Sequence, residues 1–129
     1  MPQIKVYLNT KALSMITEDK FDNLKIWLTY AVERAFEIEG KDDVAFNIIS
    51  VLYTSNESPV QIEVIYTAGE DEYNTGSIFD PTETEKDIAI LEITASFSNF
   101  LLNHRMVALT PSVWIRPQYK SRFRAGSRD

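Results

Sequence analysis

Apolar and polar residues alternate in two short stretches, each of which begins with a proline. In residues 2–8 the apolar positions are Ile4, Val6 and Leu8, and the polar positions are Gln3, Lys5 and Tyr7. Residues 59–66 repeat the same phrase, Gln-Ile-charged-Val. A period of two is typical of a half-buried strand, and a strand tolerates proline at its first position. The repeated phrase indicates two similar halves.

Each of these strands is followed by a stretch with helical periodicity. Residues 9–15 are predicted to form a loop, after which apolar residues recur every three or four positions as far as Ile38. Thr17 is the predicted N-cap of this helix, and Gly40 is placed to end it. The second helix is predicted to begin at Asp80-Pro81-Thr82-Glu83, with Asp80 as N-cap, and to run to about Asn103.

The second helix carries an unusually wide apolar surface. One seam consists of Ile88, Leu91, Ala95 and Leu102, and a second seam, which widens it, consists of Ile90, Ile93, Phe97, Phe100 and Leu101. So wide a surface is expected to meet both the sheet and another subunit.

Three further stretches are predicted to be strands. Residues 43–54 are apolar on both faces, which favours a central strand. Residues 60–68 follow a polar turn so closely that they favour a hairpin with that strand, although a connection across the sheet between the halves stays open. Residues 107–115 form the fourth strand, where Pro111 indicates an edge or a bulge, and Pro117 is expected to stop or bend the chain.

The order β-α-β-β-α-β predicts an α+β fold with two tandem β-α-β halves, about residues 2–54 and 59–117. We expect a four-stranded mixed sheet with two helices on one face, and a ferredoxin-like arrangement is the alternative with the same order. The 129 residues are expected to form a single domain, 1–129, that ends in a basic tail, 116–129.

Composition narrows the classes of function. The absence of cysteine excludes disulfides and thiolate chemistry, and the single His104 at a helix end favours a capping role over a metal site. A net charge of −6 argues against a nucleic-acid partner. Apolar runs are too short to span a membrane and no apolar leader is present, so we expect no membrane partner and a cytoplasmic protein.

Pro2 is the candidate catalytic residue. If Met1 is removed, Pro2 becomes a secondary amine, and an α-amino group has a reference pKa near ~8 that burial and nearby cations lower. Such a base could move a proton in an enol or keto acid. If Met1 stays, the Pro2 nitrogen is an amide and cannot act as a base. Cations for a small-molecule carboxylate are available at Lys11, Arg116, Lys120 and Arg122, although a solvated tail is the alternative for the last three.

A Met-Pro start that leads directly into a strand, followed by two β-α-β units, resembles the tautomerase superfamily, in particular the 5-carboxymethyl-2-hydroxymuconate isomerase and macrophage migration inhibitory factor type. The resemblance implies a cofactor-free, homotrimeric keto–enol isomerase of small enol or keto acids with Pro2 as base. It also implies a substrate-binding role for Lys11, which lies close to where several members place a basic residue. Residues 42–47, however, carry no arginine where members commonly have one. The alternative is a noncatalytic oligomeric module that binds a small ligand or a protein partner.

Overall fold

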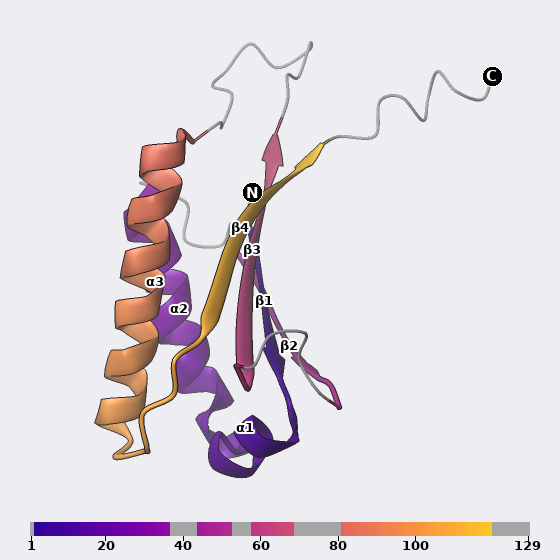
Figure 1. The fold of residues 1–129 in the computed structure, drawn as a ribbon, viewed down its shortest axis with the longest axis vertical. Coiled ribbons are helices and arrows are strands. Elements are labelled where there is room, and N and C mark those ends of the chain that lie inside the picture. Colours follow the sequence, from indigo (N-terminus) through magenta and orange to yellow (C-terminus); the bar gives the residue numbers. More distant parts are fainter. Residues whose placement is uncertain (1, 37–43, 53–57, 69–80, 120–129) are drawn as a thin grey trace, which may run out of the picture.

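The computed structural model describes residues 2–36, 44–52, 58–68 and 81–119. Its elements in chain order are β1 (Gln3–Leu8), α1 (Thr10–Met15), the short 3-10 helix η1 (Glu18–Lys20), α2 (Phe21–Phe36), β2 (Ala45–Ser50), β3 (Val60–Ala68), α3 (Glu83–Asn103) and β4 (Ser112–Tyr119). The two long helices, α2 and α3, lie side by side on one face of the sheet (Figure 1).

The sheet has the strand order β2-β1-β3-β4. The outer pairs β1–β2 and β3–β4 are parallel, and the central pair β1–β3 is antiparallel, with Gln3 opposite Ile65 and Tyr7 opposite Gln61. The predicted α+β fold with a mixed four-stranded sheet is therefore confirmed. In a ferredoxin-like fold the β-α-β unit is split by an intervening strand, so the direct pairing of β1 with β2 excludes that alternative.

Two predictions about the middle of the chain are wrong. β2 is an edge strand rather than a central one, and β3 pairs with β1 rather than forming a hairpin with β2. The connection across the sheet, which the sequence left open, is the one adopted. On β2, Phe46 and Ile48 pack against the core, while Ile49 lies on the opposite face. The second apolar face of β2 therefore has no cover from the helices that the structure describes (Figure 1).

The segment between β1 and α2 also differs from its prediction. Residues 9–15 contain the helix α1, because the Asn9 side chain accepts a hydrogen bond from the Ala12 backbone N–H at 3.0 Å and caps it. Thr17 precedes η1 rather than α2, and its hydroxyl donates to the Asp19 carboxylate instead of capping a backbone group. The predicted helix end, at Ile38 and Gly40, lies outside the described residues.

The helix α3 begins two residues later than predicted. Its N-cap is Thr82, which forms a reciprocal capping box with Glu85, whereas Asp80 lies outside the described residues. The predicted end at Asn103 is confirmed. Of the two apolar seams, it is the second that is mainly buried, through Ile93, Phe97, Phe100 and Leu101, while Ile88, Leu91 and Leu102 of the first are exposed. The second seam, which was expected only to widen the apolar surface, is therefore the one that packs against the core.

The core lies between the sheet and the helices. On the helix-covered face, Ile4, Val6 and Leu8 of β1 pack beside Val60, Ile62 and Val64 of β3. The opposite face of the sheet, called the open face below, carries Gln3, Lys5 and Tyr7 of β1, Ala45, Asn47 and Ile49 of β2, Gln61, Glu63 and Ile65 of β3, and Ser112, Trp114 and Arg116 of β4.

The strand β4 starts later than predicted, at Ser112, and Pro117 lies inside it rather than ending it. Its position at the edge is as predicted. An edge strand accommodates proline because the missing backbone N–H can face away from the neighbouring strand.

Candidate functional site

Pro2 is buried directly before β1, at the end of a central strand. The backbone N–H of Ala45 donates to its carbonyl oxygen at 3.1 Å, which fixes Pro2 against β2. Because side chains alternate along a strand, Pro2 points to the same helix-covered side as Ile4. Extending the β1–β3 register by one residue places Pro2 opposite Tyr66. The sequence-predicted base is therefore enclosed by two neighbouring strands.

A lysine and a phenol lie at the same end of the molecule. Tyr66 is buried on β3, and Lys86, in the first turns of α3, lies close enough to it for an electrostatic interaction that raises the pKa of Lys86. Lys86 also pairs with the exposed carboxylate of Glu83, at 3.0 Å between Nζ and Oε2. The hydrogen bond to Glu83 is the main reason that the pKa of Lys86 is raised, and Tyr66 acts in the same direction. Lys86 is thus a cation at the Pro2 end of the sheet, on its helix-covered side.

Arg116 is engaged by another residue. Its guanidinium Nε donates to the Glu63 carboxylate on the neighbouring strand β3, and the Tyr7 hydroxyl donates to the other oxygen of that carboxylate at 2.8 Å. These three side chains form a cluster on the open face. Arg116 and Gln3 both stand opposite Ile65, so two strand spacings, about 10 Å, separate them. Arg116 lies near the Pro2 end of the sheet, with its charge already balanced by Glu63.

The other predicted substrate-binding residues lie apart from Pro2 or outside the described chain. Lys11 lies exposed in α1, beyond the far end of β1, so the length of that strand, about 20 Å, separates it from Pro2 within one chain. In Figure 1, α1 lies at one end of the molecule and the start of α3 at the other. Lys120 and Arg122 lie outside the described residues.

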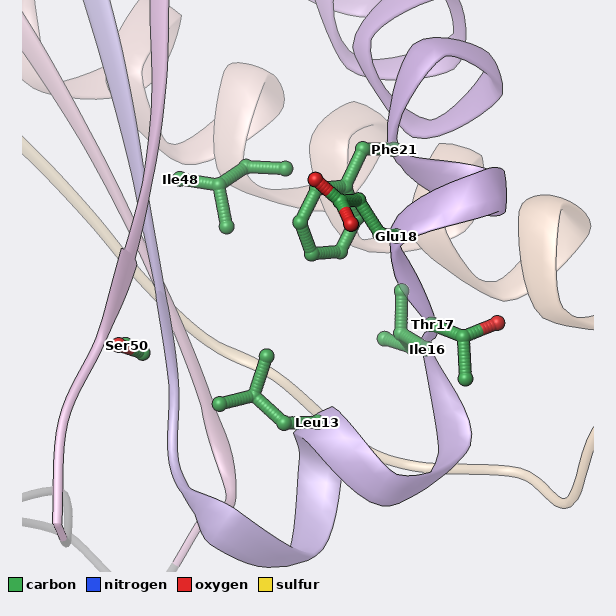
Figure 2. Close-up of a pocket in the computed structure, with 7 residues that line it drawn as sticks. All are labelled: Leu13, Ile16, Thr17, Glu18, Phe21, Ile48 and Ser50. Carbon is green, nitrogen blue, oxygen red and sulfur yellow. The ribbon is translucent and has the colours of Figure 1, made fainter.

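A pocket of about 420 Å³ opens between α1, η1, the start of α2 and the edge strand β2 (Figure 2). Its walls are the apolar side chains of Leu13, Ile16, Phe21 and Ile48, and its polar groups belong to Thr17, Glu18 and Ser50. Ser50 pairs with Leu8 at the far end of β1, so this pocket and Pro2 lie at opposite ends of the sheet.

His104 has the structural role that the sequence predicted. It is the C-cap of α3, and its Nε2 lies 2.8 Å from the Asn23 side-chain oxygen, which also accepts from the Trp27 indole N–H. In the part of the chain that the structure describes, no group of three histidine or acidic side chains could hold a metal ion. Likewise, none of the described helices has the length and apolar character needed to cross a membrane.

Sequence reasoning predicted Pro2 as the candidate base, which stays a prediction, and it did not name Tyr66, Lys86, Glu63 or Tyr7. The position of Tyr66 could have been found from the sequence, because it ends the alternating run of residues 59–66 that repeats the first strand. No sequence pattern indicates Lys86, because its position next to β3 depends on how α3 packs on the sheet.

No family model and no curated protein sequence matches the chain. Solved structures do match, at low sequence identity. The F6 fused 4-OT, an asymmetric trimer, is 18% identical, with 98% of this chain and 99% of that chain covered and a TM-score of 0.62. N1, a member of the cis-3-chloroacrylic acid dehalogenase family, is 14% identical, with 91% and 75% covered and a TM-score of 0.61.

A macrophage migration inhibitory factor-like protein from Entamoeba histolytica is 6% identical, with 94% of this chain and 91% of that chain covered and a TM-score of 0.59. All three proteins are tautomerase superfamily members. The matches cover both halves of this chain, but at 6–18% identity they do not show that residues have the same roles in the two proteins. This chain has the tautomerase fold.

Proposed function

We propose that this protein is a cofactor-independent tautomerase of small enol or keto acids, in which Pro2 is the base once Met1 is removed. The observation that carries the proposal is the burial of Pro2 at the start of a central strand in a tautomerase fold. Burial disfavours the protonated amine, so a secondary amine at this position is suited to accept a proton at neutral pH.

Lys86 and Tyr66 complete the proposed site. The substrate carboxylate and the developing enolate both need positive charge or hydrogen-bond donors. Lys86 supplies a cation from α3, and its side chain is 19% exposed, so it is shielded without being sealed. Its partner Glu83 is largely exposed, and surface ion pairs of this kind are weak enough to exchange for a substrate carboxylate. Lys86 thereby binds the substrate carboxylate in place of an arginine on β2, which this chain lacks.

Lys11 enters this proposal only through assembly. Because about 20 Å separates it from Pro2 of its own chain, it could reach only the Pro2 site of a neighbouring subunit. Lys120 and Arg122 remain proposed substrate-binding residues of the tail, and Arg116 would have to exchange its bond to Glu63 to join them.

We further propose that the protein is a homotrimer in which the open face of the sheet is buried. This face has no helix of the described chain over it, and Trp114 on it is 41% exposed. Within the described sheet β2 and β4 are the edge strands, and exposed strand edges are usually covered in native proteins. A fused 4-OT of the same fold is a trimer.

The proposal is tested with protein whose intact mass shows that it begins at Pro2. Ketonisation of phenylenolpyruvate, followed by its absorbance, should be accelerated, and Pro2→Ala should lose on the order of a hundredfold in rate. Pro59→Ala is the matched control, because Pro59 opens the paired strand with the same phrase but its nitrogen is always an amide. Equal effects of the two substitutions, or no activity in protein that begins at Pro2, would reject the proline base.

A noncatalytic ligand-binding module is the second candidate. The engagement of Arg116 by Glu63 favours it, because the strand arginine nearest to Pro2 is already neutralised within the chain. Under this alternative the Pro2 site binds small acids without converting them, so phenylenolpyruvate would bind but its ketonisation would not be accelerated.

A further inference from the structure

The pocket between α1, η1, α2 and β2 is not used by the proposed proline chemistry, because it lies at the opposite end of β1. Its volume of about 420 Å³ falls within the range of small-molecule sites. In Figure 2 the side chains of Leu13 on α1, Ile16 directly after α1 and Ile48 on β2 surround the cavity. An apolar cavity of this size can enclose the body of a ligand rather than a single water molecule.

A carboxylate faces this apolar cavity. Glu18 and Phe21 both line the cavity, and Figure 2 shows the Glu18 side chain extending from its backbone toward the side on which Ile48 lies. No hydrogen bond or ion pair joins Glu18 to another side chain within the described segments. Its neighbour Asp19 differs, since that carboxylate accepts from the Thr17 hydroxyl and lies 3.9 Å from the Lys20 ammonium. Glu18 is the one charged residue among those that line the pocket, so it supplies the negative charge there. Thr17 also lines the pocket, although its side chain points away from the cavity in Figure 2.

We propose that this pocket binds a small organic cation, an ammonium group carried on an apolar body. The ammonium group lies between the Glu18 carboxylate and the face of the Phe21 ring, where ion pairing and the cation–π interaction act together. The apolar body fills the space among Leu13, Ile16 and Ile48, and its burial favours binding. Glu18 and the net charge of −6 both disfavour an anion of the same shape.

The charge of the ligand is the variable to test. Three probes share a phenylethyl-type body: 2-phenylethylamine, which is cationic at pH 7, 2-phenylethanol, which is neutral, and phenylacetate, which is anionic. Each is titrated into the full chain, and amide chemical shifts are followed by NMR. We expect the amine to bind several-fold more tightly than the alcohol, with shifts at Leu13, Phe21 and Ile48, and phenylacetate to cause none there.

Two matched variants assign the preference to Glu18. Glu18→Gln keeps the shape and removes the charge, so it should weaken amine binding about fivefold and leave the alcohol unchanged. Glu33→Gln, on α2 and outside the pocket lining, should change neither. Each variant is compared between the amine and the alcohol on the same sample, so any general loss of structure affects both ligands alike.

Three outcomes would overturn the proposal. The first is equal binding of the amine, the alcohol and phenylacetate. The second is an unchanged amine affinity in Glu18→Gln. The third is the absence of any shift at the pocket in the wild-type protein, including the case in which a second copy of the chain covers it. None of these outcomes depends on catalysis at Pro2.

Discussion

The Glu63 side chain on β3 is only 6% exposed, yet it is ion-paired with Arg116 on β4, whose side chain is 58% exposed. Tyr7 on β1 donates to the same carboxylate at 2.8 Å. One buried charge on the open face therefore joins three adjacent strands. Such a charge is tolerated only while its oxygens have partners, so the cluster should affect stability more than a surface ion pair would.

Arg116→Ala should lower the free energy of unfolding by about 2–3 kcal/mol, because it leaves the Glu63 carboxylate buried with Tyr7 alone. Arg34→Ala is the control, because it removes an ion pair near the surface. The Arg34 side chain is 59% exposed and that of its partner Glu92 is 32% exposed. That change should cost less than about 1 kcal/mol. Urea unfolding of both variants measures the difference, and similar losses would show that Glu63 is not a buried charge.

Tyr7 should make stability depend on pH in the alkaline range. Burial is the main cause that raises the pKa of Tyr7 above its usual value of 10.0, the hydrogen bond and charge of Glu63 act in the same direction, and Arg116 opposes them. Because the folded-state pKa is the higher one, this contribution is fully present below about pH 10 and is lost as the pH rises through the folded pKa.

The measurement is the urea midpoint as a function of pH between about 8 and 11. Tyr7→Phe should lower the midpoint by a constant amount, through the lost hydrogen bond, and should remove part of the alkaline slope. A variant whose alkaline slope matches that of the wild type would contradict the raised pKa, whatever its midpoint.

Thr82→Ala should destabilise the protein by about 1 kcal/mol, because the Thr82 hydroxyl accepts the Glu85 N–H at the start of α3. Asp80→Ala is the informative comparison, since the sequence alone favours Asp80 as the cap. Thermal unfolding of the two variants decides between the residues, and a larger loss for Asp80→Ala would place the helix start two residues earlier.

The sequence predicted the helices and strands themselves better than it predicted which of them pack against one another. The bounds of β3 and the end of α3 follow from local alternation and periodicity, so they were predictable. The strand order was not, because the short link between β2 and β3 fits a hairpin as well as a crossing over β1. The buried side of α3 was also unpredictable, since two apolar seams compete and only the sheet selects one.

The candidate site divides in the same way. Pro2 was predicted as the base from its place at the start of a strand, and that place is confirmed. The positions of Tyr66 and Lys86 at the same end of the sheet depend on strand register and helix packing, which no local sequence pattern contains. Arg116 was chosen for its charge, but its partner Glu63 stands on another strand and could not be paired with it before the register was known.

Assembly through the open face predicts that Trp114→Glu dissociates the oligomer at micromolar concentration, because it replaces a partly exposed aromatic side chain of the proposed interface with a charge that would be buried there. Leu91→Glu tests the competing surface, the exposed seam of α3, and should leave the assembly intact. Light scattering of the three proteins gives the answer. A wild-type monomer would refute the trimer, and dissociation by Leu91→Glu alone would move the interface to the helices.

Lys86→Met should raise KM for phenylenolpyruvate about tenfold with a smaller change in kcat, if its ammonium group binds the substrate carboxylate equally in the ground and transition states. Lys20→Met, on η1 near the other end of the sheet, is the control and should leave both constants unchanged. Lys86→Arg should restore most of the affinity, because it keeps a cation beside Tyr66 and Glu83. A fall in kcat with KM unchanged would instead assign Lys86 to the transition state alone. A third outcome is that Pro2→Ala abolishes activity while Lys86→Met, made separately, changes neither constant. The proline base would then stand, and other cations would bind the substrate carboxylate. Lys11 of a neighbouring subunit would be the next residue to test.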